Sequence, residues 1–86
     1  MFSIAFSKIA SDQFKRICSL FPESKSELIR SLQEVRELLS RDPLGSSESR
    51  QNRDRICIVS PLTFYFTIDF QQSTIEISQV FYSRKA

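Results

Sequence analysis

The stretch RICIVSPLTFYFTIDFQQSTIEISQVF, from Arg55 to Phe81, decides the fold. Its apolar side chains recur at every second position in three runs, namely Ile56 and Ile58; Leu62, Phe64, Phe66, Ile68 and Phe70; and Ile75, Ile77 and Phe81. Alternation with period two is typical of strands that bury one face. Ser60-Pro61 and Gln71-Gln72-Ser73 provide short connections, so the sequence predicts a three-stranded antiparallel meander.

The residues before the meander predict one strand and a helical hairpin. Residues 2–6 alternate between apolar and small polar side chains, whereas from about Ser7 to Leu20 the apolar positions follow helical spacing. Pro22 suits the first turn of a second helix, whose apolar stripe runs on to Asp42-Pro43. Residues 42–54 hold the only glycine and predict a loop.

These elements predict an α+β fold in one domain that spans residues 1–86. Its order is an N-terminal strand, a helical hairpin and a three-stranded antiparallel meander, with the helices packed on one sheet face. The set expected to face the helices is Ile56, Ile58, Phe64, Phe66, Ile75 and Ile77. Alternation then places a mostly polar set on the open face: Arg53, Arg55, Cys57, Thr63, Tyr65, Thr67, Asp69, Thr74, Glu76, Ser78 and Tyr82.

Composition excludes several classes of function. There is no histidine, which removes the Ser-His-Asp and Cys-His catalytic arrangements, and a single glycine leaves neither a P-loop nor a dinucleotide fingerprint. We expect no metal and no cofactor. Cys18 and Cys57 lie in apolar stretches, and we expect two buried free thiols rather than a disulfide, because a reducing compartment is the default for such a chain. No apolar run is long enough to span a membrane, and Lys8 interrupts the N-terminal apolar residues before a signal peptide develops, so we expect a cytoplasmic protein.

The net charge of +2 is too small to predict nucleic-acid binding, so any such case rests on local placement. Basic residues enter the first strand of the meander and, with a tyrosine, leave the last, where they would grip phosphates and stack on an unpaired base. Arginine and tyrosine on a solvated strand face equally suit a purely structural role. Arg50, in the loop, also has two interpretations. It would contact RNA, or it would pair with a carboxylate and fix the loop, and the structural role is the favoured one.

Four segments carry a resemblance to the RelE/ParE superfamily of toxins from type II toxin–antitoxin systems. They are LLSRDPL (38–44), GSSESR (45–50), RICIVSPLTFYFTID (55–69) and TIEISQV (74–80). They are similar to the family's helix end with Asp-Pro, its variable loop and its two hydrophobic strands. Where RelE-type nucleases commonly place an arginine, this chain has Leu62-Thr63.

The resemblance implies a cognate antitoxin as partner and an activity of one of two kinds. RelE-type members are ribosome-dependent mRNA endonucleases, and ParE-type members act on DNA gyrase. For a nuclease, we expect catalytic roles for Arg55, Tyr82 and Arg84, which the resemblance implies. We expect RNA contacts from Lys85, also by the resemblance, and from Arg50, Arg53 and Tyr65, by their place in the loop and on the open face. The alternatives are a catalytically inert protein-binding module with this fold and a gyrase inhibitor.

Overall fold

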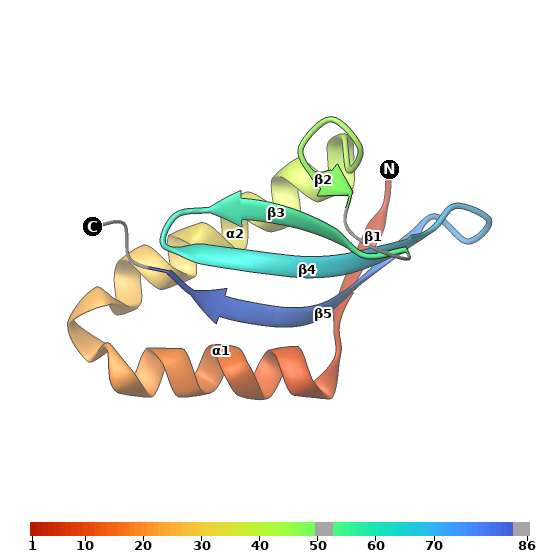
Figure 1. The fold of residues 1–86 in the computed structure, drawn as a ribbon. Coiled ribbons are helices and arrows are strands. Elements are labelled where there is room, and N and C mark those ends of the chain that lie inside the picture. Colours follow the sequence, from red (N-terminus) through yellow and green to blue (C-terminus); the bar gives the residue numbers. More distant parts are fainter. Residues whose placement is uncertain (50–52, 84–86) are drawn as a thin grey trace.

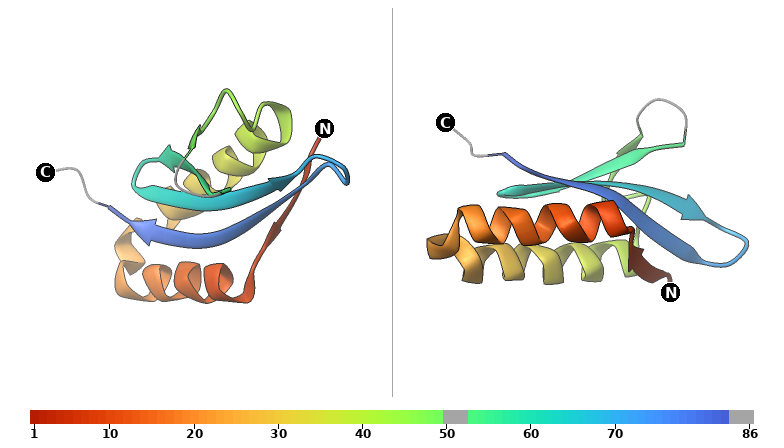
Figure 2. Two further views of the ribbon diagram at one scale, coloured as in Figure 1. Left: turned by 45° about the vertical axis from the view of Figure 1, so that its right-hand side comes forward. Right: turned by 90° about the horizontal axis from the view of Figure 1, so that it is seen from below.

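A computed structural model describes residues 1–49 and 53–83 of the chain. It has two layers, with a mixed sheet on one side and two helices covering one of the sheet's faces (Figures 1 and 2). The elements in chain order are β1 (Ser3–Phe6), α1 (Lys8–Leu20), η1 (Pro22–Ser24), α2 (Lys25–Arg41), β2 (Glu48–Ser49), β3 (Arg55–Val59), β4 (Leu62–Asp69) and β5 (Thr74–Tyr82). The predicted α+β class is confirmed.

The sheet order is β1-β5-β4-β3-β2. β3, β4 and β5 form the predicted antiparallel meander, and β1 lies parallel to β5. The two-residue strand β2 lies within the segment predicted as a loop and pairs with β3 at the sheet edge. Pro22 opens a short 3-10 turn before α2, whereas the sequence predicted it in the first turn of α2 itself.

Both helices are held to the sheet by hydroxyl groups as well as by apolar packing. Ser7 caps α1, because its Oγ accepts a hydrogen bond from the Ala10 N–H at 3.0 Å, and the same hydroxyl donates to the Ser78 carbonyl of β5. On α2, the buried Ser31 donates to the Ser60 carbonyl in the β3–β4 turn at 2.9 Å. Leu28, Ser31, Val35 and Leu39 are buried at helical spacing, so this face of α2 packs on the sheet.

The core is built from the helix-facing side chains of the meander and one stripe of each helix. Phe64 and Phe66 are the largest fully buried side chains, and Leu28 and Leu39 of α2 are also fully buried. None of the helices in residues 1–49 and 53–83 combines the length and the apolar content needed to cross a bilayer.

The prediction of which β3 side chains face the helices was wrong. Cys57 and Val59 are buried beneath the helices, whereas Ile58 is 67% exposed on the open face and Ile56 is covered there beside Glu48 of β2. The register explains the reversal, because Cys57 pairs with Phe64 and Val59 with Leu62, so that the fully buried residues of β4 fix which side of β3 faces inward.

The predicted facing of the end of β5 was also wrong, because the strand contains a bulge. Tyr65 pairs with Gln79 and Phe66 with Ile77, which leaves Ser78 as an extra residue without a partner in β4. Side chains of α1 satisfy the backbone there: Ser7 donates to the Ser78 carbonyl at 3.1 Å, and Gln13 accepts from the Val80 N–H at 2.7 Å. Beyond the bulge the alternation is shifted by one residue.

The bulge exchanges the faces of the last residues of β5. Val80 becomes buried and Phe81 is 42% exposed, opposite to the simple period-two pattern. Tyr82, predicted on the open face, lies instead on the helix side, where its ring stacks on Phe21 with centroids 4.1 Å apart and planes at 12°.

Candidate functional site

Arg55 binds the loop that follows α2. Its Nε donates to Ser47 Oγ at 2.7 Å, and its NH2 group lies 3.2 Å from the Ser47 carbonyl and 3.4 Å from the Leu44 carbonyl. Arg55 was predicted on the open face, which is wrong, since it pairs with the inward-facing Phe66 and therefore starts β3 on the helix side. Its guanidinium group holds the loop against β3.

Of the seven residues predicted for catalysis or RNA contact, the four that the structure describes do not come together as one cluster. Tyr82 is half-buried against Phe21 on the helix side, and Arg55 lies at the loop. Arg53 and Tyr65 belong to the open side of the sheet. The remaining three, Arg50, Arg84 and Lys85, lie outside the described residues.

Half of the open face, near the β3–β4 turn, is apolar. Two rows of paired residues cross it: Ile58, Thr63 and Phe81 in one, and Ile56, Tyr65 and Gln79 in the next. Tyr65 and Phe81 meet edge to face, with ring centroids 5.4 Å apart at 83°. Ile58 and Phe81 are therefore exposed in the same row, whereas Ile56 in the next row is covered beside Glu48 of β2. The two helices lie on the other face of the sheet (Figures 1 and 2).

Sequence reasoning missed Ile58 and Phe81 as surface residues because strict alternation assigned both to the core. Two signals could have found them. A two-residue Ser60-Pro61 connection pairs Val59 with Leu62, which turns Ile58 outward. Three consecutive large apolar residues, Val80 to Tyr82, cannot all follow one alternation in a half-buried strand, so a bulge was indicated.

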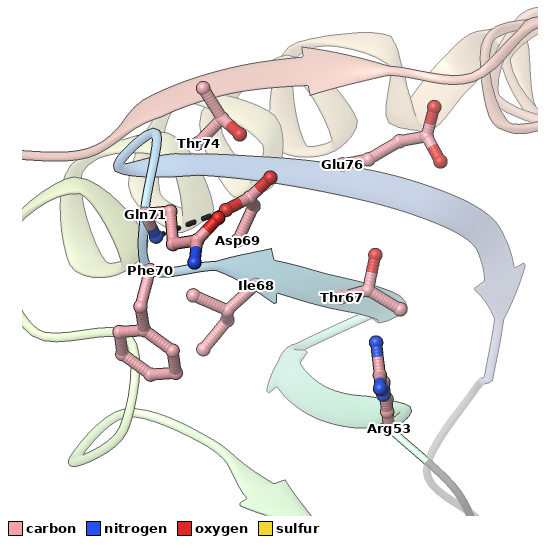
Figure 3. A pocket seen from close by; sticks show the side chains of 8 residues that line it. All are labelled: Arg53, Thr67, Ile68, Asp69, Phe70, Gln71, Thr74 and Glu76. Atoms are coloured by element: carbon pink, nitrogen blue, oxygen red, sulfur yellow. Dashed lines mark hydrogen bonds between the residues drawn. The ribbon is translucent and has the colours of Figure 1, made fainter.

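The other half of the open face is polar and forms an open cavity of about 750 Å³ (Figure 3). Arg53 lies next to Thr67 there, and Glu76 projects from the neighbouring β5. Asp69 accepts hydrogen bonds from the Gln71 and Gln72 backbone N–H groups at 3.0 and 3.1 Å, which fixes the β4–β5 turn. Within the described ranges, no ion pair joins Arg53 to Asp69 or Glu76.

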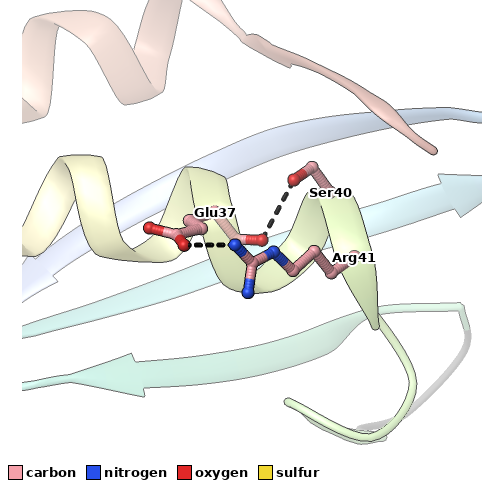
Figure 4. A network of polar contacts seen from close by, with 3 residues as sticks. All are labelled: Glu37, Ser40 and Arg41. Carbon is pink, nitrogen blue, oxygen red and sulfur yellow. Dashed lines mark hydrogen bonds and ion pairs between the residues drawn. The ribbon is translucent and has the colours of Figure 1, made fainter.

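The carboxylates on α2 have a different setting. Glu37 forms an exposed ion pair with Arg41, with 2.7 Å between Oε1 and NH2, and Ser40 donates to the Glu37 carbonyl (Figure 4). An exposed pair of this kind adds less than about 1 kcal/mol to stability.

Burial, and secondarily the carboxylate of Glu34, raises the pKa of the Cys57 thiol above its ordinary value. The carboxylates belong to the helix layer, and Cys57 faces that layer from β3, so none of these groups lies on the open face.

Among residues 1–49 and 53–83, no three side chains of the types that ligate metals lie together. Cys18 and Cys57 are free thiols, the first half-buried and the second buried.

No protein-family model matches the sequence, and no curated protein matches it. Solved structures do match. A chain of the RelBE2 toxin–antitoxin complex from Mycobacterium tuberculosis superposes with a TM-score of 0.82 at 15% identity, covering 98% of this chain and 93% of that one. A chain of the chromosomal ParDE system from P. aeruginosa gives a TM-score of 0.76 at 15% identity and 98% coverage of both chains.

The isolated E. coli RelE toxin superposes with a TM-score of 0.68 at 11% identity, covering 100% of this chain and 88% of that one. The likeness extends over nearly the whole of each chain, so it includes both helices and the complete sheet. The resemblance in the sequence is thus confirmed at the level of the fold: this chain is a divergent protein with the RelE/ParE toxin fold.

Proposed function

We propose that this chain is the toxin-like component of a type II toxin–antitoxin pair, working in the cytoplasm as a single domain, and that its open sheet face binds the antitoxin. The observation that carries the proposal is the apolar surface of the exposed Ile58 and Phe81 and the half-buried Tyr65 on a sheet with this fold. Contiguous exposed apolar surface marks protein-interaction sites, and aromatic side chains are enriched in such interfaces.

The geometry supports protein binding better than RNA cleavage. A nuclease of this kind needs basic and aromatic groups placed around one phosphate. Arg55 is engaged by the loop after α2, and Tyr82 is stacked on Phe21. An mRNA endonuclease is the second candidate, favoured by the placement of Arg53 and Tyr65 on the same open side of the sheet.

Binding is tested with the protein encoded by the adjoining reading frame, titrated calorimetrically against the purified chain. Ile58→Asp puts a charge into the apolar rows and is expected to weaken binding by more than about 30-fold, or about 2 kcal/mol. Ile9→Asp is the matched control, because Ile9 is 63% exposed against 67% for Ile58 but lies on α1. Equal affinities of the wild type and Ile58→Asp contradict the proposal.

Activity is tested separately, by expressing the chain alone and then together with that neighbouring protein. Growth arrest that co-expression relieves supports a toxin. Cleavage of mRNA on ribosomes identifies the nuclease, inhibition of supercoiling identifies an action on gyrase, and the absence of all three with retained binding identifies an inert binding module.

A further inference from the structure

We propose that the partner segment covering the open face is cationic. It would be an amphipathic segment whose apolar side packs on Ile58 and Phe81, and whose lysine or arginine side chains reach the carboxylates at the edges of this face. The inference rests on the proposed function and adds the chemistry of the partner.

The charge of the open face carries the inference. Residues paired across strands point to the same side of a sheet, so Glu48, paired with Ile56, and Glu76, paired with Thr67, both lie on the open face. Asp69 is paired with Thr74 on the same side. Among residues 1–49 and 53–83, Arg53 is the cation beside these three carboxylates, so the described part of this face carries one positive and three negative groups, a formal charge of −2.

The carboxylate of Glu76 is available to a partner. Glu76 is exposed, lines the polar cavity and points away from Arg53 in Figure 3. In the described part of the chain it forms no ion pair within 4.0 Å. A phosphate backbone is repelled by such a surface, since nucleic-acid binding depends on lysine and arginine neutralising phosphates. The same surface attracts a cationic protein segment, and the complementary charges make the binding more specific.

The spacing sets the length of the segment. Because of the bulge at Ser78, the β4 partners of Glu76 and Phe81, which are Thr67 and Thr63, are four residues apart, or about 13 Å at strand rise. An α-helix covers that distance in about nine residues. A helical segment of about 16 residues therefore has room for an apolar stripe over the rows of Ile58 and Phe81 and for a basic residue beside Glu76.

The test is a display library of 16-residue amphipathic helices with a fixed leucine stripe, in which every flanking position is either lysine or glutamate at equal frequency. Binders are selected on the whole chain and sequenced. We expect lysine to exceed glutamate by at least threefold near one end of the helix. Re-selection on Glu76→Lys should abolish or invert that excess, and a single selected peptide should lose two- to fivefold in affinity to Glu76→Gln, the size expected for one exposed ion pair.

Glu34→Lys is the control, because Glu34 lies on α2 behind the sheet, and selection on it should keep the lysine excess. Ile58→Asp should remove binding of the selected peptides. Enrichment of glutamate, or no bias, with binding that still depends on Ile58 overturns the cationic partner and leaves the proposed docking face intact. No binders, or binding indifferent to Ile58→Asp, overturns both.

Discussion

The stack of Tyr82 on Phe21 leads to a prediction about stability. The family resemblance implies a catalytic role for Tyr82, whereas in the structure its ring packs on Phe21. The rings lie 4.1 Å apart at 12° where the end of β5 meets the corner between the helices. Complete truncation of a buried aromatic costs about 3–5 kcal/mol, and Tyr82 is half-buried, so Tyr82→Ala should cost about 2 kcal/mol of unfolding free energy. Tyr82→Phe keeps the ring and should cost less than about 0.5 kcal/mol.

A double-mutant cycle isolates the stack. Urea unfolding of Tyr82→Ala, Phe21→Ala and the double variant should give a coupling energy of about 0.5–1.5 kcal/mol, the usual worth of an aromatic pair beyond burial. Phe21→Ala combined with Phe81→Ala is the control, because the two rings lie on opposite sides of the sheet and their effects should add within about 0.5 kcal/mol. A Tyr82–Phe21 coupling near zero refutes the packing role. So does a loss of mRNA cleavage in a fully stable Tyr82→Phe.

Four further predictions concern polar and titratable groups. Arg55→Ala removes the hydrogen bonds to Ser47 and should lower the unfolding free energy in urea by about 1–3 kcal/mol; no change would mean that the loop is held in another way. Ser31→Ala deletes the bond to the β3–β4 turn and should cost about 1 kcal/mol in the same assay, whereas an unchanged midpoint would show that the bond contributes nothing. The buried thiol of Cys57 should resist a thiol reagent that modifies the half-buried Cys18 at pH 8, and equal rates would contradict its burial. Because burial raises the pKa of Cys57 in the folded chain, its contribution to stability is complete below the ordinary value of 9.0 and is lost as the pH rises further, which urea titrations at pH 8–11 measure.

The element order was predictable because each segment of the sequence follows one periodicity. The stripe from Leu28 to Leu39 has helical spacing over its whole length, and the alternation from Leu62 to Ile68 extends through β4, the central strand of the meander. Pro22 and Asp42-Pro43 mark the corners of the hairpin, since proline restricts the helix there. Local patterns of this kind need no knowledge of the tertiary structure.

The facing of β3 and of the end of β5 could not be obtained in the same way. In β3, Ile56, Cys57, Ile58 and Val59 are all apolar, so the pairing with β4 decides which of them is buried. In β5 the decisive feature is the unpaired Ser78, whose carbonyl is satisfied by a side chain from the start of α1. Both are decided by contacts with other segments of the chain, so the periodicity of each strand taken alone does not determine them.

The candidate site depended on those two errors. In the structure, Tyr82 and Arg55 lie on the helix side of the sheet, and Ile58 and Phe81 lie on the open face, the reverse of the predicted arrangement. The sequence predicted a mostly polar face with basic and aromatic residues at the strand ends. In the described residues, this face is apolar at one end and acidic at the other.

The central claim is that the open sheet face binds a protein partner, and methyl NMR of the chain labelled at isoleucine tests it most directly. On addition of the protein encoded by the adjoining reading frame, the δ1 methyl signals of Ile58 and Ile56 should shift, while those of Ile9 and Ile29, exposed on the helices, should stay in place. Shifts confined to Ile9 and Ile29, with Ile58 unchanged, would show that the partner binds the helix layer and would contradict the account.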